Sequence, residues 1–159
     1  VDGVLGTLLR RLPRGTRLHV TADHGMVDTS PEHTTDLAEH PGLMRLVHEV
    51  TGEARALALH AVPGDGAGEE LVASVEALLE ERALVLSRER LLGNGMLGPV
   101  GLELSERVAG RLPDVMVLSR GRWSVDDFSR RPDTARAMVG VHGSLTAAEC
   151  WVPLLRTEI

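Results

Sequence analysis

The segment most informative about the fold is TRLHVTADHGM, residues 16–26, in which an apolar segment runs directly into a turn. Apolar and polar residues alternate through residues 16–22, which predicts a short strand with one apolar face. Asp23 and His24 come at the C-terminal end of this strand, and Gly25 permits a sharp turn after them. Ligands in open α/β sheets bind beyond the carboxyl ends of strands, so we expect a site here.

Outside this stretch, helical and strand-like patterns alternate along the chain. Apolar residues recur at helical spacing over residues 1–12 and, most clearly, over residues 69–82. A short amphipathic helix is expected over 43–50, and loops over 93–101 and 120–140. Short apolar stretches predict strands at 55–62, 84–86, 114–119 and 152–155. The alternation predicts an α/β layered fold with a mostly parallel sheet, and no repeat or linker divides residues 1–159.

Composition limits the classes of function. The chain has 159 residues, and 43% of them are hydrophobic, which excludes a disordered chain. Its net charge of −6 argues against a nucleic-acid partner, because binding to phosphates needs a basic surface. No run of about 18 apolar residues predicts a membrane-spanning helix. Cys150 is the single cysteine, so an internal disulfide is excluded. No export signal is visible, and the cytoplasm is the default expectation. Because Val1 opens the chain inside a helical pattern, we expect a longer parent chain.

Asp23 and His24 form the strongest local candidate for chemistry. A carboxylate beside an imidazole supplies the oxygen and nitrogen ligands that zinc, manganese and iron accept. An adjacent Asp-His pair is also common by chance, and a capping or salt-bridged aspartate is the alternative on spacing alone.

The second candidate segment is VHGSLTAAE, residues 141–149. Thr146 and Glu149 have the spacing of a capping box, so a short helix is predicted to begin just after the His-Gly turn. His142 would then lie on a loop held by a defined helix start, which is a geometry that can fix a ligand. The alternative is a loop histidine bound to the backbone.

Taken together, the two segments resemble the type I phosphodiesterase/nucleotide pyrophosphatase family of the alkaline phosphatase superfamily. In that family T-A-D-H-G-M ends a central strand, as residues 21–26 do here. Later the family shows H-G-S-L-T-x-x-E and then V-P-L-L, which match residues 142–149 and 152–155. The resemblance spans essentially the whole chain, but only the C-terminal part of the family's catalytic domain.

The resemblance implies a hydrolase that cleaves phosphodiester or pyrophosphate bonds with a two-zinc site. Asp23 and His24 would bind one metal ion, and His142 would bind the other. Two such ions can clamp the attacking and leaving oxygens of an in-line displacement. The partners implied are a phosphodiester or nucleotide substrate and the missing N-terminal part of the same chain.

The family's other catalytic groups are absent from these residues. Its Thr or Ser nucleophile, a further Asp ligand and an Asp-x-x-x-His pair would lie upstream of Val1, so no catalytic nucleophile is assigned here. Asp36 and His40 have the Asp-x-x-x-His spacing but follow the first motif, and we interpret them as a solvated face. The hydroxyls of Thr21, Thr29 and Ser144 match no nucleophile motif and are interpreted as structural.

Two alternatives remain open at this stage. One keeps the superfamily but changes the reaction to phosphonate or phosphomonoester hydrolysis or to phosphoglycerate mutase-type transfer. The other is a non-catalytic α/β binding module in which the three ligand residues are relics.

Overall fold

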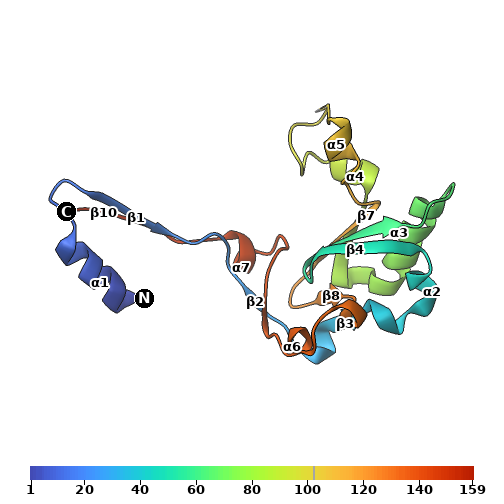
Figure 1. Cartoon of the computed structure of the whole chain (residues 1–159), viewed down its shortest axis with the longest axis horizontal. Coiled ribbons are helices and arrows are strands. Elements are labelled where there is room, and N and C mark those ends of the chain that lie inside the picture. Colours follow the sequence, from blue (N-terminus) through green and yellow to red (C-terminus); the bar gives the residue numbers. More distant parts are fainter. Residues whose placement is uncertain (102) are drawn as a thin grey trace.

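The structure is a computed structural model that describes residues 1–101 and 103–159, arranged as a layered body with a narrow arm (Figure 1). The α-helices are α1 (Asp2–Arg11), α2 (Pro41–Met44), α3 (Ala67–Leu79), α4 (Arg88–Gly93), α5 (Glu106–Ala109), α6 (Asp133–Arg136) and α7 (Ala147–Cys150). The strands are β1 (Arg17–Thr21), β2 (Val27–Asp28), β3 (Thr34–Asp36), β4 (Val47–Glu53), β5 (Ala56–Ala61), β6 (Ala83–Ser87), β7 (Val115–Ser119), β8 (Ser124–Asp126), β9 (Gly140–Val141) and β10 (Leu154–Glu158). Short 3-10 turns are η1 (Pro31–His33), η2 (Leu37–Glu39), η3 (Glu80–Arg82) and η4 (Phe128–Arg130).

The body is built on a sheet with the strand order β4-β5-β7-β6. Successive side chains of a strand point to opposite faces, and the two faces of this sheet are covered by different helices. On one face, α3 packs its buried residues Leu71, Val75 and Leu79 against the sheet. On the other face, Leu91 of α4 packs with Leu86 and Leu118. Each fully buried aliphatic side chain contributes roughly 1.5–3 kcal/mol, so the α3 face is the main core.

The mixed α/β class is confirmed, but the expectation of a mostly parallel sheet is wrong for the described part of the chain. Strands β5 and β6 are joined through α3 and run in the same direction, as in a parallel crossover. However, β7 lies between them and is antiparallel to both. Strands β4 and β5 form a hairpin, so they are antiparallel as well. Strands β3 and β8 form a parallel pair.

Several predicted elements are confirmed and others are not. The helix expected over 69–82 begins two residues earlier, after Gly66, whose φ of +77° suits glycine. The amphipathic helix expected over 43–50 is wrong, because α2 ends at Met44 and β4 begins at Val47. The loop expected over 120–140 contains β8, β9 and short helical turns, since parallel pairing with β3 satisfies the backbone of a segment whose own pattern is weak.

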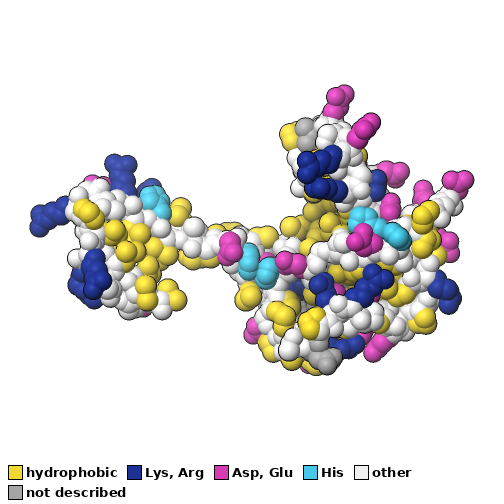
Figure 2. Space-filling view, viewed as in Figure 1, with side chains coloured by type: hydrophobic (Ala, Val, Ile, Leu, Met, Phe, Trp, Pro, Cys, Tyr) yellow, Lys and Arg dark blue, Asp and Glu magenta, His cyan; other side chains and the backbone are white. Residues whose placement is uncertain are grey.

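The arm consists of α1 and the antiparallel ribbon of β1 and β10 (Figure 1). No residue of α1 is buried, and every residue of β10 is exposed. Figure 2 shows hydrophobic side chains gathered on this arm. The large exposed hydrophobic residues there are Val1, Val4, Leu8, Leu9, Leu154 and Leu155, and the exposed Trp151 and Val152 precede β10. Within the described residues, no helix has the length and apolar character needed to cross a membrane.

Candidate functional site

The segments of the two predicted motifs meet where the arm joins the body. Strand β1 leads through Asp23 and His24 into β2, and β2 pairs antiparallel with β9, which directly precedes His142. The pair Val27–Val141 sets the register, and it brings the two histidines face to face. Their rings stack with centroids 3.7 Å apart and an interplanar angle of 20°. Figure 2 shows histidine and acidic side chains together at this junction. The structure therefore brings together all three residues that the motifs indicate.

Asp23 and His24 present adjacent atoms of the kinds that bind metal ions. The Oδ2 atom of Asp23 lies 3.7 Å from Nε2 of His24. The Nδ1 atom of His24 lies 2.8 Å from the carbonyl oxygen of Gly25, which can only accept, so Nδ1 carries the proton and Nε2 has a free lone pair. Two ligand atoms on one tetrahedral zinc ion lie about 3.4 Å apart, so this spacing fits a shared ion.

The carboxylate of Asp23 is held in its ionised form. Hydrogen bonds from the backbone N–H groups of Asp23 itself and of His24 lower the pKa of this carboxyl, and the electrostatic effect of the neighbouring His24 imidazole lowers it further. The N–H of His24 donates to Oδ1 over 3.1 Å, which leaves Oδ2 on the side of the imidazole. The carboxylate is therefore ready to bind a cation without first losing a proton.

His142 has an acidic neighbour that the sequence did not indicate. Its Nδ1 atom lies 3.1 Å from Oε2 of Glu53, at the end of β4. Its Nε2 atom takes no part in this contact. Within the described residues, no three acidic, histidine or cysteine side chains converge on one point, so the corner is not a complete single-metal site.

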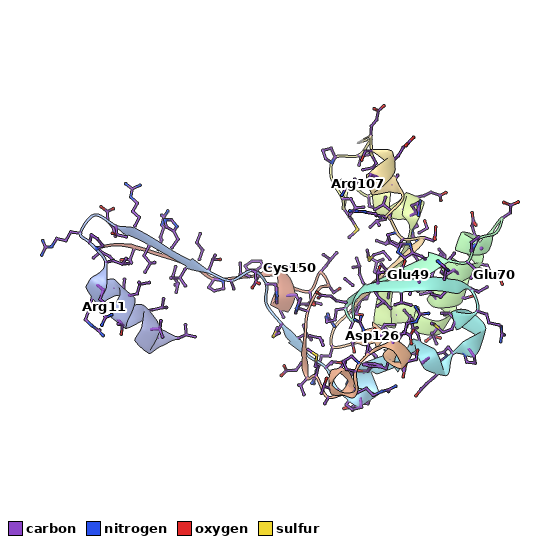
Figure 3. The ribbon with its side chains drawn as sticks, viewed as in Figure 1. Arg11, Glu49, Glu70, Arg107, Asp126 and Cys150 are labelled. Carbon is purple, nitrogen blue, oxygen red and sulfur yellow. The ribbon has the colours of Figure 1, made fainter. Side chains whose placement is uncertain are left out.

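Helix α7 ties the two histidine segments together. The N–H of Gly25 donates to the carbonyl of Glu149 over 2.8 Å. The N–H of Ser144 donates to the Glu149 carboxylate over 3.0 Å. One residue of α7 thus holds both the Asp23–His24 turn and the His142 loop. Cys150, labelled in Figure 3, marks the end of this helix at the junction.

The Glu149 carboxylate is itself anchored by a buried arginine. Arg55 forms two hydrogen bonds with it, Nε to Oε1 at 2.6 Å and Nη2 to Oε2 at 2.7 Å. Both side chains are almost completely buried. Burial raises the pKa of Glu149, but the hydrogen bonds from Arg55, Thr146 and the Ser144 N–H outweigh it and lower the pKa to about 2. Arg55 also donates to the carbonyls of Trp123 and Ser119, so its buried charge is well compensated.

This arrangement corrects the capping-box prediction. A helix does begin after Thr146, but the Thr146 side chain makes no capping hydrogen bond to the backbone. Its hydroxyl donates to the Glu149 carboxylate instead, which faces inward to Arg55. The buried ion pair competes successfully for the carboxylate, because an uncompensated guanidinium in the interior is costly.

The other candidate residues have structural roles. Thr29 and Ser144 are buried, and their hydroxyls bond to Ser124 and to the carbonyl of Ser119. Asp36, expected on a solvated face, is buried and pairs with Arg136 at 2.6 Å. The expectation of a solvated face was wrong because the neighbouring helix α6 is remote in sequence and supplies the arginine.

A cavity of about 400 Å³ adjoins the site. Its polar lining includes His142 and Glu53 and the hydroxyl-bearing residues Thr29, Thr34 and Ser124. Its apolar lining includes Met26, Val141, Phe128, Pro132, Ala135 and Met138. The corner that holds the histidines therefore borders a space with both polar and apolar surfaces.

Comparison with known proteins supports the motif evidence. The structure resembles human ectonucleotide pyrophosphatase/phosphodiesterase 5, with a TM-score of 0.63 and 18% identity over 97% of this chain and 37% of that one. The murine protein gives a TM-score of 0.62 and 19% identity, with the same coverage, and the same values hold for its inactive variant in complex with AMP. The chain thus spans a little over a third of these relatives. No curated protein sequence matches the chain. The family model of the type I phosphodiesterases/nucleotide pyrophosphatases matches residues 1–145, and the chain belongs to this family.

Proposed function

We propose that residues 1–159 are the C-terminal part of a metal-dependent catalytic domain that hydrolyses phosphodiester or pyrophosphate bonds. Asp23 and His24 bind one zinc ion of a two-metal site, and His142 binds the second. The observation that carries the proposal is that the two family-matched segments meet at one corner, where the rings of His24 and His142 stack 3.7 Å apart and Asp23 lies beside His24.

The ligand atoms at this corner are suited to divalent zinc. In both histidines Nδ1 lies close to an oxygen atom, of Gly25 for His24 and of Glu53 for His142, which leaves Nε2 for a metal ion. The Asp23 carboxylate is ionised, and it faces the His24 nitrogen. Nitrogen and carboxylate oxygen are ordinary zinc ligands. Three ligands cannot complete two tetrahedral sites, so the remaining ligands and the nucleophile belong to another part of the catalytic domain.

The residues of the site and those that support it have separate tasks in the proposed reaction. When bound, zinc polarises the phosphoryl oxygen and activates the nucleophile. Asp23, His24 and His142 hold the two cations, while α7 and the Arg55–Glu149 pair keep the two ligand segments in register. The cavity beside His142 gives room for one substituent of the substrate phosphorus.

The arm fits the role of a buried element in a larger domain. Leu154 on β10 is 68% exposed, and Trp151, which follows α7, is 83% exposed, so large apolar side chains face outward in this part of the chain. An apolar surface of this kind marks a contact with other protein. We therefore propose that the remainder of the catalytic domain covers the arm and completes an alkaline-phosphatase-like layered fold around β1.

The test uses the full-length protein that contains this chain. We expect bound zinc by elemental analysis and turnover of bis-p-nitrophenyl phosphate. Asp23→Ala, His24→Ala and His142→Ala should each lower kcat/KM by at least about 100-fold, because even second-shell changes cost 10- to 100-fold. His48→Ala is the matched control, since His48 is an exposed histidine on β4.

Unchanged turnover in Asp23→Ala or His142→Ala would refute the site. A strong preference for p-nitrophenyl phosphate over the diester would instead favour a phosphomonoesterase reaction. A full-length protein with no zinc and no turnover of either ester would favour the binding-module alternative.

A further inference from the structure

We propose that Glu53 is a positioning residue that orients His142 as a metal ligand. The inference rests on the proposed metal site, and it concerns a residue outside both sequence motifs. The carboxylate of Glu53 lies beside the imidazole of His142, with Oε2 and Nδ1 3.1 Å apart, close enough for the carboxylate to favour a proton on Nδ1. This contact fixes the ring orientation and the tautomer, so that Nε2 has its lone pair free for the metal ion.

The residue after the histidine makes room for this carboxylate. Gly143 has a φ of +119°, a conformation that favours glycine. A Cβ atom at this position would lie 3.2 Å from Oε2 of Glu53 and 3.5 Å from the Cβ of Ala56. The His-Gly sequence of the motif therefore has a local reason, because the glycine lets the histidine loop lie against the turn that carries Glu53.

The turn that carries Glu53 is held from several sides, although Glu53 itself is exposed. Gly52, with a φ of +85°, accepts a hydrogen bond from Arg131 over 3.2 Å. The carbonyl of Ala54 accepts from the N–H of Val125 over 2.7 Å. Arg55 is anchored in the interior by the Glu149 carboxylate. The backbone of the turn is thus fixed on both sides of Glu53, so its carboxylate is presented to His142 from a rigid support.

The same turn reaches both halves of the site. Glu53 contacts His142 directly, and Arg55 reaches the Asp23–His24 turn through Glu149, whose carbonyl accepts the Gly25 N–H. Opposite charges two residues apart therefore have different tasks. Glu53 sets the orientation of one imidazole, and Arg55 sets the position of the segments that carry the ligands.

The first measurement is made on the metal-free full-length protein with histidine labelled with nitrogen-15. At a pH where the imidazole is neutral, long-range proton–nitrogen spectra should show His142 in the Nδ1–H form. Glu53→Ala should shift the ring toward the Nε2–H form, whereas Glu49→Gln should leave it unchanged. Glu49 is exposed on the same strand, β4, and is labelled in Figure 3. A purely structural role for Glu53 would not change the tautomer.

The second measurement is the zinc dissociation constant by chelator competition. Glu53→Ala and Glu53→Gln should weaken zinc binding roughly 10- to 100-fold. Their thermal midpoints without metal should match that of the wild type, because 58% of the Glu53 side chain is exposed. Wild-type zinc affinity and tautomer in Glu53→Ala, with weakened zinc binding in His142→Ala, would overturn the role of Glu53 and leave the metal site intact. Wild-type zinc affinity in His142→Ala would overturn the metal site instead.

Discussion

Gly25 and Ala148 approach so closely that a Cβ atom at position 25 would lie 1.9 Å from the carbonyl oxygen of Ala148. The turn that carries Asp23 and His24 is pressed against the backbone of α7 at this point, and the Gly25 N–H bonds to the next carbonyl, that of Glu149. Glycine is therefore required here by a close approach of two backbones. The distance between the two ligand segments depends on this contact.

Replacing Gly25 with alanine should separate the turn from α7. Because the clash is with backbone, which cannot swing aside, we expect a loss of about 2 kcal/mol or more in the free energy of unfolding. Zinc affinity and diester turnover should fall together with stability. Urea unfolding and chelator competition on the full-length protein would measure both.

Gly3→Ala is the matched control for this substitution. Gly3 lies in α1 with nothing within 4 Å of its would-be Cβ, so alanine there should be neutral or stabilising by up to about 1 kcal/mol. Equal stability of Gly25→Ala and Gly3→Ala would contradict the close contact with Ala148.

The buried Glu149 carboxylate should make stability depend on pH in the acid range. Its pKa is about 2 in the folded protein against an ordinary 4.5, so the folded state binds the proton more weakly than the unfolded state. The contribution is therefore present above pH 4.5 and is lost as the pH falls through this range toward about 2. The shift corresponds to roughly 3 kcal/mol. Urea midpoints across this range should fall less steeply in Glu149→Gln than in the wild type, and parallel profiles would refute the assignment.

Removing Arg55 alone should lower the free energy of unfolding more than removing both charges of the Arg55–Glu149 pair. Arg55→Met leaves a buried carboxylate without its cation and should cost about 3–5 kcal/mol in the free energy of unfolding. Adding Glu149→Gln to Arg55→Met removes the uncompensated charge and should recover part of that loss. A double-mutant cycle by urea unfolding measures the coupling, and additive effects would show that the two side chains act independently.

Patterns that are local in sequence predicted much of the fold. The apolar spacing of residues 69–82 predicted α3, and the apolar stretches predicted β5, β6 and β7, because these elements bury their own side chains in the core. Strand β8 and the position of β7 between β5 and β6 depend on pairing between distant segments. Side-chain periodicity carries no record of strand order, so the antiparallel arrangement was not predictable.

The candidate site also contains residues that the sequence predicted and residues that it did not. Asp23, His24 and His142 were predicted from two motifs, and the structure places them side by side. Glu53 and Arg55 were not predicted, because a lone acidic or basic residue at the end of a strand has no distinctive pattern. Their partners are 89 and 94 residues away along the chain, at His142 and Glu149.

Zinc binding should weaken in acid because of the histidines and not because of Asp23. Backbone hydrogen bonds lower the pKa of the Asp23 carboxyl, so it stays ionised below the range usual for aspartate. Imidazole must be neutral to bind a metal ion, and protons compete for Nε2. Isothermal titration in buffers of different ionisation enthalpy should therefore show proton release that grows as the pH is lowered from neutral. His142→Ala should release fewer protons, and an unchanged count would exclude this histidine from the site.

The apolar surface of the arm predicts a contrast between two exposed positions. Leu154 is 68% exposed and Val100 is 71% exposed, so in these residues alone an aspartate should be tolerated equally at both. If the rest of the catalytic domain covers the arm, Leu154→Asp buries an unpaired charge in the full-length protein and should cost roughly 2–3 kcal/mol in the free energy of unfolding. Val100→Asp, outside the arm, should stay within about 0.5 kcal/mol of the wild type. Urea unfolding of both variants gives the comparison. Equal stability would mean that Leu154 faces solvent in the whole protein, and the proposed packing of the domain around β1 would be wrong.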